Sequence, residues 1–208
     1  FGIGGESGGV LHHPKRWDGL TITRLPMGHA VSSTAMQVHS SMGAVANGGI
    51  LMKPQFIHRI FDERGKTVVS FNPKPIRRVV NSSVTQSVTE MLVSVVSVEG
   101  TAKQARIEGF EVAGKTGTTK KLIEGQYSNR HHVASFVGFF PAKDPRIVMT
   151  VVVDEPKMKP GLTGYGGTVA APAFQRVGKK IIAYLGLKPI PPQEKTLAQD
   201  TRATRSAL

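Results

Sequence analysis

The stretch Val-Ala-Gly-Lys-Thr-Gly-Thr-Thr at residues 112–119 is the most informative in the chain. Its composition predicts an extended strand, on which successive side chains point to opposite faces. The hydroxyls of Thr116 and Thr118 should share a face, and the bare Gly117 lets another backbone approach closely. With the ammonium of Lys115 nearby, the strand could hold a carboxylate and the carbonyl of an extended peptide along its edge. This pattern indicates an acyl-transfer site.

A Lys-Thr-Gly triplet is short, and about nine in ten such matches in unknown proteins would be a plain strand with an ordinary surface lysine. Strict alternation also puts Lys115 on the face opposite Thr116 and Thr118. Because the Lys side chain is long and sheets twist, we expect its ammonium to reach the hydroxyls around the strand edge.

The second half of the chain predicts three strands and a helix. The strands are apolar runs separated by polar or proline-containing connections, so we expect an antiparallel meander of residues 110–119, 133–140 and 146–153. Residues 168–185 carry apolar side chains at helical spacing, and Gly186 follows as a C-cap. This amphipathic helix should cover one face of the sheet.

The first half predicts two helices and a hairpin. One helix begins after an N-cap at Ser32 or Ser33, where apolar residues start to recur at spacings of three and four. A second helix is expected over residues 84–98, because its spacing favours a helix although its many valines would suit a strand. Residues 56–71 read as a hairpin between them. Residues 1–27 predict no element.

Composition and charge limit the class of protein. With 208 residues, 39% of them hydrophobic, the chain can bury the core of one domain or of a large piece of one. It has no Cys, which excludes disulfides and thiolate metal sites, and no apolar run near the roughly 18 residues of a membrane span. The net charge of +13 would attract anionic polymers, but the basic residues are dispersed, so nucleic-acid binding is not expected.

Seven short motifs occur in a fixed order across nearly the whole chain, and the Lys-Thr-Gly strand is one of them. They are residues 1–9, Met27–Ala30, Ala46–Gly49, Val98–Ala102, Ala113–Thr118, Phe136–Pro141 and Gly166–Pro172. Their order resembles that of class B penicillin-binding proteins, whose superfamily carries Ser-x-x-Lys and Lys-Thr-Gly motifs.

The resemblance implies an α/β penicillin-recognition fold, an antiparallel sheet flanked by helices. Residues 1–188 would be the C-terminal portion of a transpeptidase domain, and residues 189–208 a disordered tail. The chain opens at Phe1 with no signal peptide, so we expect the anchoring segment to lie upstream. The domain itself would lie in the bacterial cell envelope, outside the cytoplasmic membrane.

The same resemblance implies a serine acyl-enzyme mechanism with no metal or cofactor. A serine attacks the D-Ala-D-Ala bond of a peptidoglycan stem peptide, an amine from a neighbouring stem resolves the acyl-enzyme, and β-lactam antibiotics mimic the substrate. Lys115 would supply positive charge and join the proton relay. The hydroxyls of Thr116 and Thr118 would bind the carboxylate beside Gly117, which must stay small. The Thr118 N–H would be an oxyanion-hole donor, a group worth about 2.7–4 kcal/mol.

The nucleophile of that mechanism is not in this sequence. No serine has Lys three positions later, and the nearest pattern, Thr118–Lys121, overlaps the strand itself. Ser70 begins a formal Ser-x-Asn match, but it lies in the predicted hairpin, so we interpret it as a decoy. The chain alone is therefore predicted to be inactive without the N-terminal portion of the same protein. Two departures from the family are Ala30 in place of Gly, expected to be benign, and a polar insertion at 120–132, expected to be a mobile loop.

Other functions stay open. A serine β-lactamase or D,D-carboxypeptidase shares the Lys115 strand, a non-catalytic β-lactam sensor would keep the fold without turnover, and a basic binder of anionic polymers would lose affinity steeply with salt. Other cell-wall synthesis or division proteins are further expected partners. The pairs His12-His13 and His131-His132 are expected in surface loops rather than in a metal site, because adjacent histidines on a strand point apart.

Overall fold

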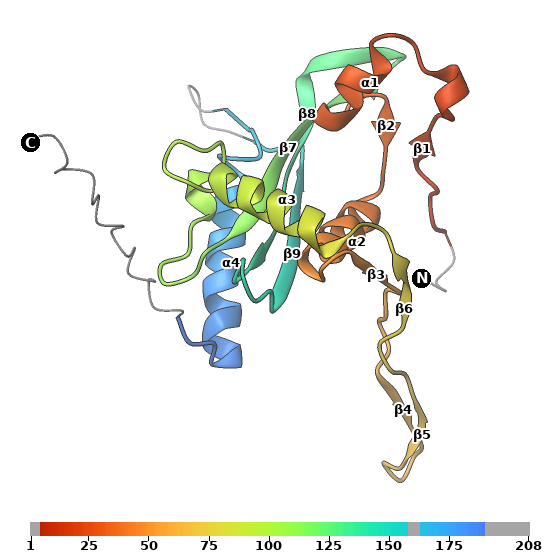
Figure 1. Cartoon of the computed structure of the whole chain (residues 1–208), viewed down its shortest axis with the longest axis vertical. Helices are drawn as coiled ribbons and strands as arrows, with labels where there is room; N and C mark the ends of the chain where they lie inside the picture. The colour runs from red at the N-terminus through yellow and green to blue at the C-terminus, as the bar shows by residue number, and fades with distance from the viewer. Residues whose placement is uncertain (1–4, 158–162, 190–208) are drawn as a thin grey trace, which may run out of the picture.

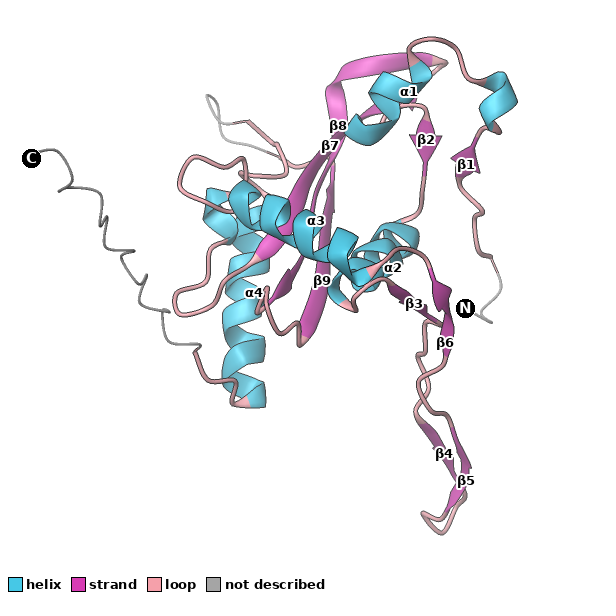
Figure 2. Ribbon diagram, in the orientation of Figure 1, coloured by secondary structure: helices cyan, strands magenta, loops and turns pink. Residues whose placement is uncertain are grey.

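The computed structural model describes residues 5–157 and 163–189, with a three-stranded antiparallel sheet at its centre (Figures 1 and 2). The strands are β7 (Ala113–Ile123), β8 (Gln126–Phe140) and β9 (Ile147–Asp154), in the order β7-β8-β9. This is the predicted meander, which is confirmed. Within the described residues β7 pairs with β8 alone, so it is an edge strand.

The hairpin between β7 and β8 extends further than the sequence predicted. Residues 120–132, expected to be a loop, continue both strands as far as the pair Ile123–Gln126. Glu124 and Gly125 close it with φ of 50° and 80°, and two positive φ values give the turn that matches the twist of the strands. The loop prediction was wrong because polar residues also suit strands whose faces are exposed to solvent.

Helix α4 (Ala170–Leu185) covers one face of the sheet and confirms the predicted C-terminal helix. Phe136 and Phe140 from β8 and Phe174 from α4 are fully buried there. The Phe174 ring lies edge-on to the other two, at centroid distances of 4.8 and 5.8 Å. Burying each ring stabilises the fold by about 1.5–3 kcal/mol. The helix ends at Gly186, whose φ of 61° suits a residue without a Cβ.

Helices α2 (Ala35–Ala46) and α3 (Ser82–Val95) lie against the opposite face (Figure 1). Met42 of α2 packs there with Val137 and Phe139 of β8, and partly buried residues of α3 join the same cluster. Spacing therefore identified α3 correctly as a helix despite its valines.

The start of α2 differs from the predicted one. Its N-cap is Thr34, whose hydroxyl accepts from the Gln37 N–H while the Gln37 side chain accepts from the Thr34 N–H at 2.8 Å. The predicted caps, Ser32 and Ser33, were wrong by one or two residues. All three hydroxyl residues suit an N-cap, but only Thr34 has Gln three positions later, which completes a capping box.

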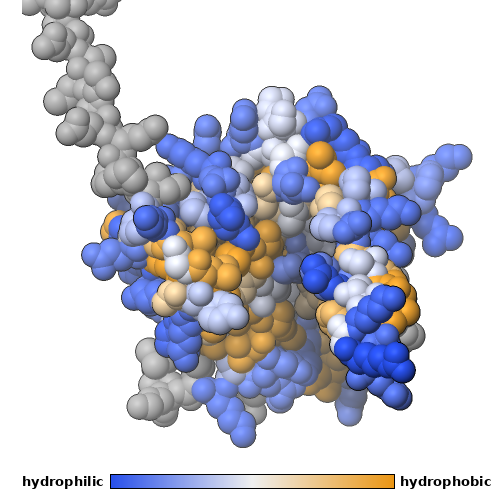
Figure 3. All heavy atoms as spheres, turned by 90° about the horizontal axis from the view of Figure 1, so that it is seen from below, coloured by the Kyte–Doolittle hydropathy of each residue, from blue (hydrophilic) through white to orange (hydrophobic). Residues whose placement is uncertain are grey.

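The segment between α2 and α3 forms an arm that extends from the body (Figure 1). At its root β3 (Ile50–Met52) pairs with β6 (Pro75–Arg78), and further out β4 (Arg59–Phe61) pairs with β5 (Thr67–Ser70). The predicted hairpin is confirmed, with shorter strands. Apolar side chains are exposed on the arm, among them Phe61 at 55%, and hydrophobic surface is visible at this end of the molecule (Figure 3).

The N-terminal region contains short elements that the sequence did not predict, because two to four residues leave no measurable period. They are the pair β1 (Val10–Leu11) and β2 (Val31–Ser32), the helix α1 (Thr21–Arg24), and 3₁₀ turns at Pro14–Arg16 and Leu25–Met27, with another at Lys103–Ala105 further on.

Ala30 has a φ of 58°, in the left-handed region. That conformation costs a residue with a Cβ about 1–2 kcal/mol, so the departure from Gly carries backbone strain. Among the residues described, no helix is both long and apolar enough to cross a membrane. The predicted tail lies outside the described residues from residue 190 onward.

Candidate functional site

The Lys-Thr-Gly stretch lies on the edge strand β7, with its side chains divided between the two faces of the sheet. Lys115 is paired with Val137, so it lies on the α2 face, while Thr116 is paired with the buried Phe136 on the α4 face. The Lys115 side chain therefore leaves the strand on the face opposite Thr116 and Thr118, as strict strand alternation predicted. Lys115 is exposed, and its Nζ donates to the carbonyl of Thr116 at 3.0 Å, which brings the charge back to the strand backbone.

The two hydroxyls that were expected to act together lie on one face, and each meets a group from another segment. Thr116 Oγ1 lies 3.3 Å from Thr101 Oγ1, and Thr118 Oγ1 accepts from the Gly166 N–H at 3.2 Å. They open on a hollow of about 480 Å³ lined by Gly100, Thr101, Lys103, Gln104, Thr116, Thr118, Tyr165, Gly167 and Thr168.

The hollow is suited to an anion. Among the described residues that line it, Lys103 alone is charged, and the Lys115 ammonium lies at the other side of the same strand. Hydroxyl groups and cations are the partners that a carboxylate prefers, because an ionised carboxylate can only accept hydrogen bonds.

Close backbone packing explains the glycines around this strand. A Cβ on Gly117 would lie 2.4 Å from Ser135 Oγ, a hydroxyl that must rotate to make room for it. A Cβ on Gly166 would lie 2.3 Å from the Ser135 carbonyl, and one on Gly167 2.1 Å from the Thr101 carbonyl. The segment before α4 therefore lies directly on the sheet and on the loop that carries Thr101.

The histidine pairs occupy two different environments. His12 and His13 are exposed outside any strand or helix, as predicted. His131 and His132 are half-buried on β8, so the expectation of a surface loop was wrong for this pair. His132 Nε2 lies 2.7 Å from the Gly164 carbonyl. No group of three His, Cys, Asp or Glu side chains placed to hold a metal ion occurs in the described part of the chain.

An ion cluster fastens the β7–β8 hairpin to the end of β9. Lys121 Nζ contacts Glu155 Oε1 at 2.8 Å and Asp154 Oδ1 at 3.1 Å, and His131 Nδ1 lies 3.4 Å from Glu155 Oε2. Hydrogen bonds from Lys121 and then His131 lower the pKa of Glu155, and hydrogen bonds to Glu155 and then Asp154 raise the pKa of Lys121. Each of these side chains keeps contact with solvent, so the cluster orients the hairpin more than it stabilises it.

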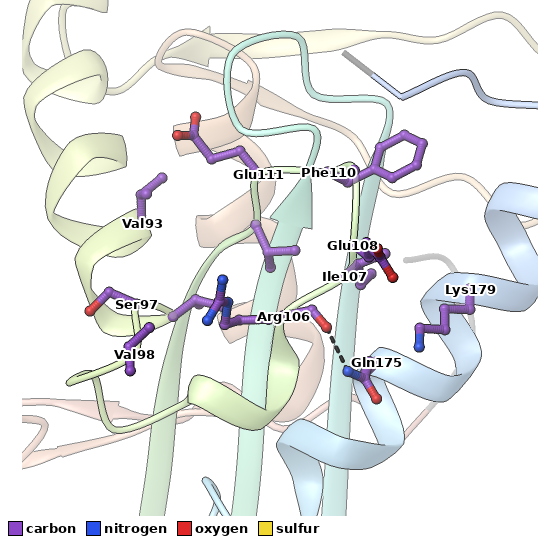
Figure 4. A pocket seen from close by; sticks show the side chains of 13 residues that line it. Val93, Ser97, Val98, Arg106, Ile107, Glu108, Phe110, Glu111, Gln175 and Lys179 are labelled. Carbon is purple, nitrogen blue, oxygen red and sulfur yellow. Dashed lines mark hydrogen bonds between the residues drawn. The ribbon is translucent and has the colours of Figure 1, made fainter. Parts of the chain in front are cut away.

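Two other features are less suited to the predicted chemistry. Ser70 is exposed on β5 in the arm, away from β7 in Figure 1, which agrees with its interpretation as a decoy. A larger hollow of about 710 Å³ lies between the end of α3, residues 106–112 and α4 (Figure 4). It carries charges of both signs, Arg106 and Lys179 with Glu108 and Glu111, and none of the Lys-Thr-Gly residues lines it.

Comparison with known proteins links the chain to one family. Residues 1–179 match the family described as penicillin binding protein transpeptidase domain. The chain is 32% identical over 195 residues to a probable peptidoglycan D,D-transpeptidase PenA of Neisseria flavescens, covering 94% of this chain and 45% of that protein. It is 37% identical over 186 residues to stage V sporulation protein D of Bacillus subtilis, covering 89% and 28%.

A solved structure supports the same relationship. Penicillin binding protein 3 from Mycobacterium tuberculosis, complexed with ampicillin, matches with a TM-score of 0.79 and 28% identity, covering 93% of this chain and 44% of that one. The chain therefore spans less than half the length of each of these three proteins.

Proposed function

This chain belongs to the penicillin-binding protein transpeptidase domain family, and we propose that it is the C-terminal portion of a class B peptidoglycan D,D-transpeptidase. Its sheet and helices are part of the transpeptidase fold, as the sequence predicted. The observation that carries the proposal is the edge strand β7, on which the hydroxyls of Thr116 and Thr118 open on a hollow lined by Lys103, with the Lys115 ammonium at the other side of the same strand. Relatives named peptidoglycan D,D-transpeptidase support the reaction.

The proposed reaction is acyl transfer to a serine. The serine hydroxyl attacks the carbonyl of the D-Ala-D-Ala bond, an ester forms, and the terminal D-Ala leaves with the proton. An amine of a second stem peptide then attacks the ester, which forms the cross-link and returns the proton to the serine. Thr116 and Thr118 donate their hydroxyls to the terminal carboxylate, and the Thr118 N–H stabilises the oxyanion. Lys115 supplies positive charge to the proton relay.

The proposed reaction needs residues from outside this chain. Its 208 residues contain no Ser-x-x-Lys, so the nucleophile comes from the N-terminal portion of the same protein. In this proposal residues 1–188 are the C-terminal part of the domain, and the parent is anchored so that the domain faces the peptidoglycan. β-Lactams are the expected inhibitors, and the ampicillin complex of the mycobacterial relative supports this.

Intact mass spectrometry after treatment with excess penicillin tests the proposal, applied to the parent protein and to this chain. The parent should gain the mass of one drug molecule and the chain should gain none. Lys115→Ala in the parent should slow labelling by about a hundredfold or more, because proton relays contribute that much. Ser70→Ala is the matched control and should leave labelling unchanged.

Each other outcome points to a different function. A labelled chain would mean that the nucleophile lies within these 208 residues, against the proposal. An unlabelled parent would contradict the acyl-enzyme and favour a module without turnover. Rapid release of hydrolysed drug from the parent would favour a β-lactamase of the same fold.

A further inference from the structure

His132 connects the sheet to the segment that borders the hollow. It lies on β8, and its Nε2 is 2.7 Å from the carbonyl oxygen of Gly164. A carbonyl oxygen can only accept, so Nε2 carries the proton and donates it. The His132 ring also meets the Tyr165 ring edge-on, with centroids 6.3 Å apart. His132 therefore fixes the leading end of residues 163–168 against the sheet.

The trailing end of this segment is fixed by helix α4. The Gly166 carbonyl accepts from the N–H groups of Ala170 and Ala171 at 3.0 and 2.9 Å, in the first turn of the helix. Gly166 is thus held from both sides, with its carbonyl toward the helix and its N–H toward Thr118 Oγ1 at 3.2 Å. There is no room for a Cβ at Gly166, which shows how closely the segment approaches β7.

The direction of the hydrogen bond at Thr118 follows from these contacts. An N–H can only donate, so the Thr118 hydroxyl must accept from Gly166 and is left to donate its own proton elsewhere. Within the described residues Thr118 has no acceptor for that proton, and its side chain borders the hollow. Thr116 differs, because either hydroxyl of the Thr101–Thr116 pair can be the donor.

We propose that His132 is a positioning residue: by holding Gly164 it keeps the Gly166 N–H on Thr118, so that the Thr118 hydroxyl presents its proton to a ligand carboxylate. This inference rests on the proposed function and adds a determinant of specificity to it. Because a carboxylate has only acceptors to offer, a hydroxyl fixed as a donor favours an anionic ligand over its neutral ester.

The test compares penicillin with its methyl ester on the parent protein. The quantity measured is the second-order rate constant of acylation by each compound, and their ratio gives the preference for a free carboxylate. His132→Ala should lower the rate with penicillin about tenfold and leave the rate with the ester nearly unchanged, which corresponds to about 1.4 kcal/mol for one hydrogen bond to a charged group. A loss that is equal for both compounds would overturn the inference.

Three variants separate positioning from a general structural role. His132→Gln keeps an N–H donor at a similar reach and should retain most of the preference. His131→Ala, the matched neighbour whose partner is Glu155, should change neither rate. In a double-mutant cycle, adding His132→Ala to Thr118→Val should cause no further loss, because both changes remove the same hydrogen bond to the drug. Additive losses would contradict the proposed connection.

The outcomes also distinguish this inference from the proposed function. If penicillin does not label the wild-type parent, the proposed function fails and the inference fails with it. If the parent is labelled and His132→Ala keeps the wild-type ratio, only the inference is overturned. If His132→Ala does not fold, Gly166→Ala replaces it in the cycle, since its Cβ would push the segment away from Ser135 and should reduce the same ratio.

Discussion

The two faces of the sheet differ in how completely this chain covers them. On the α4 face, Phe136 and Phe140 are fully buried beneath Phe174. On the α2 face, Val137 and Phe139 are also buried beneath the helices, whereas Val152 on β9 is 46% exposed and Lys115 is exposed on β7. The α4 face is a closed core, whereas the α2 face is covered at Phe139 but open at Lys115, where the proposed chemistry requires an accessible cation.

This difference separates the residues that hold the fold from those proposed to act. The phenylalanines of the closed face have no exposed surface, and Lys115 contributes little buried apolar area. Thr116 and Thr118 belong to neither group. They lie on the α4 face, but at its edge, where the covering residues end. The effect of a substitution on stability should therefore depend on how completely the side chain is buried more than on which strand carries it.

The largest effect is expected at the centre of the closed face. Phe174→Ala removes a fully buried ring that meets two others, so it should lower the free energy of unfolding by about 3–5 kcal/mol. Urea unfolding of the chain measures this. Val152→Ala changes a half-exposed side chain on the α2 face and should cost well under half as much. Equal costs would show that Val152 is covered as completely as Phe174.

A smaller effect is expected from overpacking the same core. A Cβ on Gly178 would lie 2.6 Å from Ile107 Cδ1 and 3.4 Å from the Phe140 ring. Gly178→Val should therefore destabilise the chain by about 1–3 kcal/mol. Gly178→Ala is the control and should cost less, because the Ile107 terminal methyl can move and Ala gains up to about 1 kcal/mol of helix propensity over Gly. If Gly178→Val left the free energy of unfolding unchanged, α4 would not be closely packed against Ile107 and Phe140.

Much of this arrangement could be predicted from the sequence. Spacing identified α2, α3 and α4, and the apolar runs identified β7, β8 and β9, because one strand or helix face is buried in each case. Errors occurred where several residues suit the same role, as at the N-cap Thr34, and where polar residues continue a strand into solvent, as in 120–132.

The lining of the hollow could not be predicted in the same way. Thr116 and Thr118 share a face because of the strand period, but their partners come from distant segments. Thr101 is 15 residues from Thr116, Gly166 is 48 from Thr118, and His132 is 32 from Gly164. No local pattern records such contacts. A signal existed only in the Gly-rich run before α4, which indicated close backbone packing without saying against what.

The open face should respond in activity without responding in stability. Lys115→Ala should leave the free energy of unfolding within about 0.5 kcal/mol of the original chain, since the side chain is exposed and its hydrogen bond is to one backbone carbonyl. Urea unfolding of Lys115→Ala and of Phe174→Ala, under the same conditions, compares their losses of unfolding free energy directly. A loss comparable to that of a core residue would mean that Lys115 is packed against another part of the protein and that this face is closed.

The smallest effect is expected at the ion cluster where the β7–β8 hairpin meets the end of β9. The pKa of Glu155 is lowered from its usual 4.5, so its contribution to stability is present above that value and is lost as the pH falls through the lower, folded-state pKa. The pKa of Lys121 is raised from 10.5, so its contribution is present below that value and is lost only as the pH rises further. Glu155→Gln should therefore lower Tm slightly at neutral pH, and the variant and the original chain should converge in acid. Added salt should shrink the difference at neutral pH, because the groups are exposed and screened. A large difference that persists in acid would instead show that Glu155 is held by buried contacts, and that the hairpin end of the sheet is packed as tightly as the α4 face.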